Sequence, residues 1–257
     1  MSNKEKAVAI LNALASGDTT PLEQFISDET YIQHNLSAPS GKAAFLGMVP
    51  MLANDPNTKV NIVRVIEDGG LVVCHTEYFL AAFGGALVGF DVFRFENGLV
   101  VEHWDNLQAI ATETASGRTQ LDGPTDVTDH DKTEANRTFA QGFVNDILMG
   151  KALDKITAYI STETYHQHNP SVGDGLAAFG EASAAMAEAG TPMVYSQNHL
   201  LAVEGNFAFA ASEGQFLGNH VAFFDLIRIE NGLIVEHWDV IQEIPAKEEW
   251  QNDNGKF

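Results

Sequence analysis

The stretch ENGLVVEHWD, residues 96–105, returns almost unchanged as ENGLIVEHWD at residues 230–239. The two copies lie 134 positions apart, and YIQHN at residues 31–35 returns as YHQHN at residues 165–169 with the same offset. This period is far too long for a solenoid repeat, so the pattern indicates duplication of a whole domain.

The repeat predicts the domain organisation of the chain. We expect a first domain over residues 1–111, a linker over 112–133, a second domain over 134–246 and a polar tail over 247–257. The linker is rich in Thr, Asp, Gly and Ser, which favour loops. The offset widens to 136 where Asp68 aligns with Glu204 and returns to 134 later. A hairpin loop of the second copy should therefore be about two residues shorter.

Each copy places predicted helices before predicted strands. Helical spacing of apolar residues marks residues 4–15, 22–25 and 43–52 in the first copy, and 138–149, 153–159 and 177–189 in the second. Alternating, β-branched strands follow in the first copy at residues 60–67, 71–79, 88–95 and 99–107. This order predicts an α+β domain in which helices pack across one face of a curved antiparallel sheet.

The last hairpin, around Asn97-Gly98, decides which side chains share a face. A two-residue turn would pair Glu96 with Leu99, whereas a bulge at Gly98 would pair Phe95 with Leu99. We favour the bulge. A slip by one residue would move every side chain of the strand to the other face.

The favoured register brings candidate catalytic residues together on one face. It predicts Asp91 opposite His103, with Asp105 two positions further along the same strand. Arg94 and Glu102 then pair on the other face. Buried charged groups are rare without a partner or a purpose, and two enclosed carboxylates raise one another's pKa. The candidates for proton transfer are Asp91, His103 and Asp105, with Asp225, His237 and Asp239 in the second copy.

Other polar residues are candidates for substrate binding. They either precede the third helix of each copy or lie on the strand that contains His75. The set is His34, Asn35, His75 and Glu77 in the first copy, with His168, Asn169 and Glu213 in the second. Each also has a purely structural interpretation, as a turn or core residue. Ala211 aligns with His75, so the two copies are chemically unequal.

Composition excludes several classes of partner. The 257 residues include 35 acidic and 14 basic ones, and the net charge of −21 disfavours nucleic acid and anionic membrane surfaces. The single cysteine, Cys74, excludes an intrachain disulfide. No stretch is typical of a signal peptide or a membrane span, so we expect a soluble cytoplasmic protein.

Three stretches together resemble the SnoaL-like polyketide cyclases of the nuclear transport factor 2-like superfamily. They are YIQHN at residues 31–35, FDVFR at residues 90–94 and EHWD at residues 102–105. The resemblance implies two tandem cone-shaped α+β barrels, in which helices close a pocket against the sheet. It also implies aldol-type ring closure without a cofactor, with Asp105 and Asp239 as acid/base, and an intrachain pseudo-dimer.

Three functions follow from these residues. The first is a cofactor-independent lyase or isomerase, in which Asp105 or Asp239 moves a proton beside a carbonyl of a small apolar substrate, while His103, His237, Asn35 or Asn169 steady the enolate. The second is a pocket that binds a small molecule without turning it over, in one copy or both. The third is a metal triad of His75, His103 and Asp105, which we do not favour because the second copy lacks the first histidine. Neither a metal nor a cofactor is expected.

Overall fold

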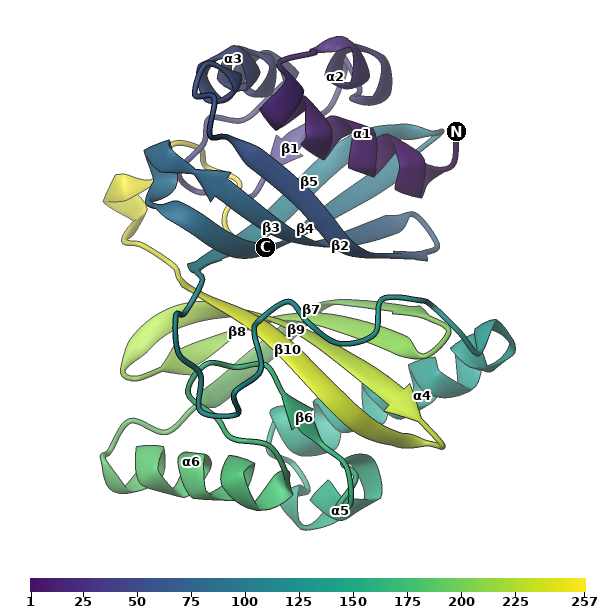
Figure 1. Ribbon diagram of the computed structural model, residues 1–257, viewed down its shortest axis with the longest axis vertical. Coiled ribbons are helices and arrows are strands. Elements are labelled where there is room, and N and C mark those ends of the chain that lie inside the picture. Colours follow the sequence, from purple (N-terminus) through teal and green to yellow (C-terminus); the bar gives the residue numbers. More distant parts are fainter. The chain divides into compact units, whose positions relative to one another are not determined.

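The computed structural model describes residues 1–257, which fold as two compact units (Figure 1). Unit 1 comprises Met1–Ile110 together with Ile244–Phe257, and unit 2 comprises Ala111–Glu243. The segment that follows the second repeat therefore belongs to the first unit, and the segment that follows the first repeat belongs to the second.

Unit 1 has its helices first and its main strands afterwards, as the sequence predicts. Its elements are α1 (Asn3–Ser16), α2 (Thr20–Phe25), β1 (Ile32–Gln33), α3 (Lys42–Ala53), β2 (Lys59–Asp68), β3 (Leu71–Leu80), η1 (Ala81–Phe83), β4 (Gly85–Glu96), β5 (Leu99–Ala109) and, in the C-terminal segment, η5 (Lys247–Glu249). The sheet order is β1-β5-β4-β3-β2. Strand β1 pairs in parallel with β5 and was missed, because two residues show no periodicity.

Unit 2 repeats this order with the sheet β6-β10-β9-β8-β7. Its elements are η2 (His130–Lys132), α4 (Thr133–Phe143), the π-helical turn η3 (Val144–Leu148), η4 (Leu153–Lys155), α5 (Ile156–Tyr159), β6 (His166–Gln167), α6 (Leu176–Glu188), β7 (Val194–Glu204), β8 (Phe207–Phe216), β9 (Asn219–Glu230) and β10 (Leu233–Glu243). Each unit thus has a curved five-stranded sheet with helices packed against it, which confirms the expected α+β fold; neither sheet closes on itself (Figure 1).

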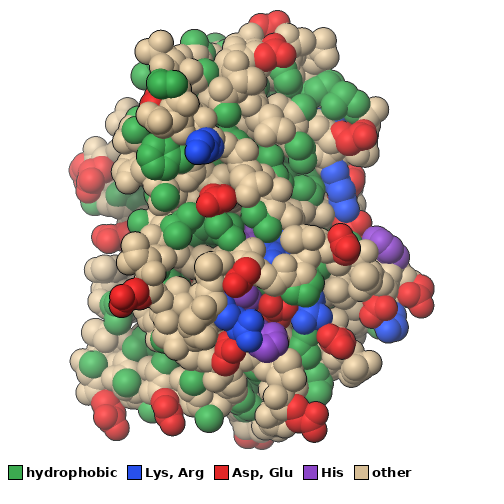
Figure 2. Space-filling model, in the orientation of Figure 1, with side chains coloured by type: hydrophobic (Ala, Val, Ile, Leu, Met, Phe, Trp, Pro, Cys, Tyr) green, Lys and Arg blue, Asp and Glu red, His purple; other side chains and the backbone are tan.

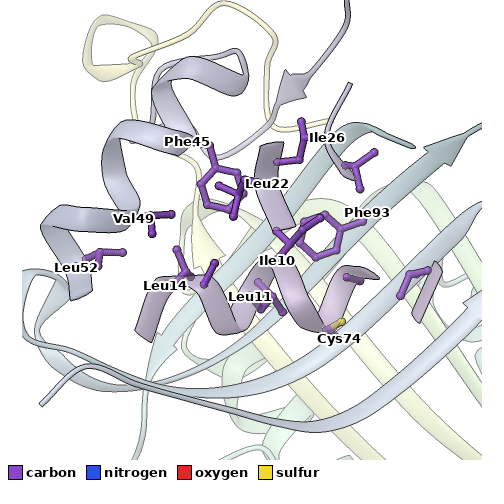
Figure 3. Packing of buried hydrophobic residues seen from close by; sticks show 14 of the residues in the cluster. Ile10, Leu11, Leu14, Leu22, Ile26, Phe45, Val49, Leu52, Cys74 and Phe93 are labelled. Atoms are coloured by element: carbon purple, nitrogen blue, oxygen red, sulfur yellow. The ribbon is translucent and has the colours of Figure 1, made fainter. Parts of the chain in front are cut away.

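The first helix of unit 1 shows why the chain folds this way locally. Ser2 accepts a hydrogen bond from the backbone N–H of Glu5, whose side chain accepts one from the backbone of Ser2, so a capping box starts α1. Gly17 ends it in a left-handed conformation (φ 76°). Between them, Ile10 and Leu11 are buried against the sheet (Figure 3).

The last hairpin of unit 1 corrects the favoured register. Asn97 and Gly98 both have positive φ (50° and 77°), which makes a two-residue turn and pairs Glu96 with Leu99. The bulge lies one pair further along, where Val101 is the extra residue. Turn and bulge together shift the pairing by two residues, so His103 and Asp105, beyond the bulge, keep their predicted face, whereas Val100, before it, packs with Phe95 in the core.

The observed register places Asp91 opposite Asp105, and His103 opposite Phe93. The prediction that Asp91 pairs with His103 is therefore wrong by two residues, because Asp91 pairs with Asp105. The side chains of Asp91, His103 and Asp105 nevertheless share one face of the sheet. Unit 2 has the same arrangement, with Asp225 opposite Asp239.

The predicted difference in loop length is confirmed. Strands β3 and β4 are joined by four residues, 81–84, whereas β8 and β9 are joined by Leu217 and Gly218 alone. The short loop holds Leu217 at φ 51°, a conformation that large side chains rarely adopt.

Each unit is covered by the segment that follows the other repeat. In unit 1, residues 251–257 lie along the loop after β1: the N–H of Gln251 donates to the carbonyl of Leu36, and Asn254 Nδ2 donates to the carbonyl of Gln33. In unit 2, the N–H of Ala115 donates to Pro170, the counterpart of Leu36. We call residues 251–257 and 111–122 the straps.

The acidic surplus is distributed over the surface. Acidic side chains are scattered across the face shown in Figure 2, with fewer basic ones among them. None of the helices combines the length with the hydropathy that a membrane span requires.

Deleting residues 251–257 should loosen unit 1 selectively. The deletion removes the strap hydrogen bonds from the loop after β1 and leaves buried backbone groups without partners, at about 1 kcal/mol or more for each. Hydrogen exchange should accelerate at residues 33–38 and stay unchanged at the equivalent residues 167–172. Equal acceleration in both loops would contradict the assignment of this strap to unit 1.

Candidate functional site

Gln167, His237 and Asp225 form a hydrogen-bonded chain across three strands of unit 2. Nδ1 of His237 lies 2.8 Å from Gln167 Oε1, and Nε2 lies 3.0 Å from Asp225 Oδ1. The backbone N–H of Asn169 donates to the same glutamine oxygen at 3.1 Å. That oxygen is therefore an acceptor, and Nδ1 of His237 carries a proton. The other nitrogen and the Asp225 carboxyl then hold a second proton between them.

Electrostatics favour a charged imidazole in this chain. Burial disfavours the cation, but the hydrogen bond to Asp225 and the charges of Asp239 and Asp225 outweigh it and raise the pKa of His237. The hydroxyl of Tyr195 also donates to Asp225 Oδ1, at 3.1 Å. Burial and the charge of Asp225 raise the pKa of Tyr195, so this hydroxyl keeps its proton.

Like Asp225, Asp239 has a buried oxygen without a hydrogen-bond partner; unlike Asp225, it lines the unit 2 cavity. Its Oδ2 accepts a hydrogen bond from Asn169 Nδ2 at 2.7 Å, while its buried Oδ1 has no hydrogen-bond partner. Burial and then the charge of Asp225 raise the pKa of Asp239, against the opposing effects of His237 and Asn169. A carboxylate of raised pKa is a stronger base near neutral pH.

Unit 1 repeats this chain. Nδ1 of His103 lies 3.0 Å from Gln33 Oε1, Nε2 lies 3.1 Å from Asp91 Oδ1, and Asn35 Nδ2 donates to Asp105 Oδ2 at 2.8 Å. Burial raises the pKa of Asp91 most, with the nearby imidazole opposing it. The predicted trio of side chains thus meets in each unit, while the glutamine that fixes the histidine was missed.

A tyrosine hydroxyl reaches the buried aspartate from a different strand in each unit. In unit 1 it comes from Tyr78 on β3, 2.5 Å from Asp91 Oδ2. Unit 2 has Gly214 at the position of Tyr78, and Tyr195 on β7 lies beside that glycine. An internal alignment could not find this equivalence, because the same contact is made from positions that do not align.

A cavity of about 320 Å³ opens beside the hydrogen-bonded side chains of unit 2. Polar groups from β6, β10 and the loop after β6 form one end of it: Tyr165, Gln167, Asn169, His237 and Asp239. The rest is mostly apolar and comes from α4, η3, α6 and the β8–β9 loop: Phe143, Ile147, Leu148, Phe179, Ala182, Ser183, Met186, Phe216 and Leu217 among others.

In unit 1, helix α3 fills the corresponding space. Phe45, Val49 and Leu52 are buried from α3 and pack toward α1 and the sheet (Figure 3). The ring of Phe45 stacks over His103, with 6.4 Å between centroids. Helix α6 of unit 2 has no buried residue. The hydrogen-bonded side chains of the two units are arranged alike, but the cavity lies in unit 2.

Residues 7–103 match the family of SnoaL-like domains. Unit 1 is a SnoaL-like domain. Unit 2 repeats its sequence blocks and its sheet order. No curated protein sequence matches the chain closely enough to count as a relative.

Several solved structures are similar in fold. Wild-type IdmH from Streptomyces antibioticus, a candidate polyketide cyclase, is 16% identical, with 42% of this chain and 93% of that chain covered and a TM-score of 0.36. A candidate ketosteroid isomerase from Kribbella flavida is 15% identical, with coverages of 45% and 83% and a TM-score of 0.37. TsrD from Streptomyces laurentii is 17% identical, with coverages of 42% and 92% and a TM-score of 0.35. No activity follows from similarity at this level.

Two histidines of the SnoaL-like repeats, predicted to bind substrate, face away from the polar chains. His34 stacks on Trp104 and lies 2.8 Å from Glu102 Oε1, on the opposite face of the sheet. His168 has the same contacts with Trp238 and Glu236. Each histidine follows the glutamine of the short parallel strand, whose side chain faces the site, so by alternation its own ring lies on the opposite face. They order the straps instead: Nδ1 of His34 lies 2.9 Å from the carbonyl oxygen of Gly255.

The three predicted candidates on β3 and β8 are also corrected. His75 pairs with Phe90, stacks on its ring and lies on the face opposite Asp91. Glu77 follows two positions later and shares that face. Glu213 lies on the equivalent face of unit 2, bound to His199 and His220. Strand alternation excludes all three from the pocket, and it excludes the metal triad that included His75.

The polar chains can still be compared with a metal site. Asp225, His237 and Asp239 offer ligand atoms within 4.8 Å of one another, as do Asp91, His103 and Asp105. The proton on Nδ1 of each histidine leaves Nε2 as the possible ligand atom. In each chain that atom already lies against an aspartate oxygen, so a cation would have to replace the shared proton.

Replacing Asp239 by Asn should stabilise the protein at neutral pH. Because its pKa is raised on folding, the folded state holds the proton more tightly than the unfolded chain, and stability is lost as pH rises through the folded-state pKa. Denaturant unfolding should show a gain on the order of 1 kcal/mol near pH 7 that shrinks toward about pH 4. The exposed control Glu188→Gln should show no such trend. A loss of stability in Asp239→Asn at pH 7 would contradict the assignment of an unfavourable buried charge.

Leu217→Gly should also stabilise unit 2. Glycine adopts the positive φ of this position without the roughly 1–2 kcal/mol cost of a side chain there, and Leu217 is 56% exposed, so little burial is lost. Leu217→Ala is the matched control, since it removes the side chain but keeps a Cβ at positive φ. Thermal unfolding should show a gain for glycine and none for alanine.

Proposed function

We propose that unit 2 is a cofactor-independent lyase or isomerase, which transfers a proton next to the carbonyl of a small apolar substrate. The observation that carries this proposal is the free oxygen of Asp239, a carboxyl of raised pKa at the polar end of a largely apolar cavity. A desolvated base beside an apolar pocket is suited to abstracting a weakly acidic C–H proton.

The proposed step uses only side chains of this unit. Asp239 Oδ1 takes the proton from the carbon beside the carbonyl, and the C–H electron pair moves into the C–C bond while the carbonyl oxygen becomes an enolate. Tyr165 OH accepts a hydrogen bond from Gln167 Nε2 at 3.4 Å, so its own proton is available to the enolate oxygen. The enolate carbon then attacks a second carbonyl, whose oxygen takes the proton back from Asp239; in a substrate with a conjugated double bond, Asp239 instead returns the proton to the far carbon of the dienolate.

His237 acts on Asp225 rather than on the substrate. Both of its ring nitrogens are engaged, by Gln167 and by Asp225. Its charge offsets that of Asp225, and this lowers the cost of ionising Asp239 on the facing strand. The role expected for the histidine from the sequence, steadying the enolate, passes to Tyr165 and Asn169 in this proposal.

A second function is favoured by the same engagement of His237. With no imidazole nitrogen facing the cavity, the pocket resembles one that binds an apolar carbonyl compound without turning it over. Native mass spectrometry distinguishes the two functions: a retained ligand with no turnover supports binding alone.

Proton transfer is tested by solvent deuterium exchange into a panel of ketones and ketoesters. Asp239→Asn should reduce exchange by a factor of about 100 or more, the typical contribution of a general base. Asp105→Asn, the equivalent change in unit 1, should leave most exchange intact because α3 fills that site. Absence of exchange in the native protein would rule out the lyase or isomerase.

His237→Gln should shift the pH profile of exchange. Without the cation beside Asp225, the pKa of Asp239 rises further, so the limb that rises with pH should move to higher pH. A profile unchanged in position would show that the imidazole carries no charge in the active form.

A further inference from the structure

A second hollow of about 380 Å³ adjoins the unit 2 cavity. The two share six lining residues: Ile147, Leu148, Phe179, Ser183, Met193 and Tyr195. The hollow continues past them between α5, the segment before it, and α6. Because the same six residues line both spaces, the second hollow lies directly beside the cavity.

The sequence of α6 explains why this space exists. Gly180, Ala182 and Ser183 stand where α3 of unit 1 has Leu46, Met48 and Val49, at the offset of 134. The large side chains pack into the core of unit 1. The small ones do not fill the space beside α6: Gly180 is exposed and lines the hollow, and a Cβ built on it would meet no atom within 4 Å.

The chemistry of the hollow is apolar. None of its lining residues is charged, and the part beyond the shared wall includes Leu153, Ile156, Leu176 and Pro192. Leu153 is 59% exposed. Large exposed apolar side chains beside an open pocket mark a surface that gains free energy when an apolar group covers it.

The π-helical turn η3 contributes Ile147 and Leu148 to the lining of both spaces. Met149 N–H donates to the carbonyl of Val144, five residues back, and the widened turn includes Ile147 and Leu148. The equivalent helix of unit 1 is α-helical to its end at Ser16. Single π turns often occur at functional sites.

We propose that the ligand of unit 2 is a ketone with a long unbranched apolar chain. Its carbonyl lies at the Asp239 end of the cavity, and its chain runs past Phe179 and Met193 into the second hollow. The position of the carbonyl rests on the proposed function, whereas the position of the chain rests on the hollow itself. The six shared residues and the absence of charge favour a chain of the same molecule over a separate partner.

The test is a homologous series of methyl ketones, from butanone to undecanone, titrated calorimetrically against the full chain. Each methylene that enters an apolar site should tighten binding about fourfold. Affinity should therefore keep rising after the first cavity is filled.

Gly180→Leu is the variant that blocks the hollow. It installs the unit 1 side chain at a position with open space and replaces glycine by a better helix former, so α6 should remain folded. Long ketones should lose at least about tenfold in affinity and short ones should bind as before. Gly180→Ala controls for the backbone, and Gly47→Leu on α3 places the same side chain in unit 1; neither should change binding.

The outcomes separate the two proposals. If affinity depends on chain length and Gly180→Leu abolishes this dependence, while the native protein shows no deuterium exchange, the hollow is supported as a chain-binding site and the proposed enzyme activity is ruled out. Exchange with no gain beyond the shortest ketones, or with long ketones unaffected by Gly180→Leu, overturns the second hollow as a chain site and leaves the enzyme.

Discussion

The pairing of β9 with β10 is the constraint on which the site depends. It holds Asp225 directly opposite Asp239 on one face, with His237 two positions away on that face. Two facing carboxyls in a buried setting repel one another, and the imidazole held between Gln167 and Asp225 makes the arrangement tolerable. The bulge after the Asn231-Gly232 turn matters for the same reason. If β10 were shifted by one residue against β9, His237 and Asp239 would lie on the other face from Asp225.

The sequence predicted the parts of the fold that have a period or repeat. The duplication, the helices before the strands and the shared face of Asp91, His103 and Asp105 all follow from spacing. The two-residue strand β1 and the turn type around Asn97 did not, because each depends on contacts made elsewhere in the fold. A register error of two residues left Asp91, His103 and Asp105 on one face, so the predicted grouping of these three residues was still correct.

The misplaced site residues share a different physical cause. His34 and His168 directly follow the two-residue strands β1 and β6, and they alternate with Gln33 and Gln167, which face the site. Because the sequence did not reveal these short strands, the alternation could not be applied to them. His75 lies on a strand, but the sequence alone did not relate the face of β3 to that of β5. The hydrogen bond from a tyrosine to the buried aspartate could not be predicted from the repeat, because Tyr78 and Tyr195 reach equivalent carboxyls from strands that do not align.

The two repeats keep one polar chain but treat the space above it differently, and this separates stability from function. In unit 1 the large side chains of α3 fill the space and gain the free energy of burial. In unit 2 the same helix has small residues, the site retains a cavity, and Leu217 holds a conformation that glycine would adopt without strain. A chain selected for stability alone would have filled the second space as it filled the first. The buried Asp239, the cavity and the strained Leu217 therefore occur together in one unit, as the proposed ligand site would require.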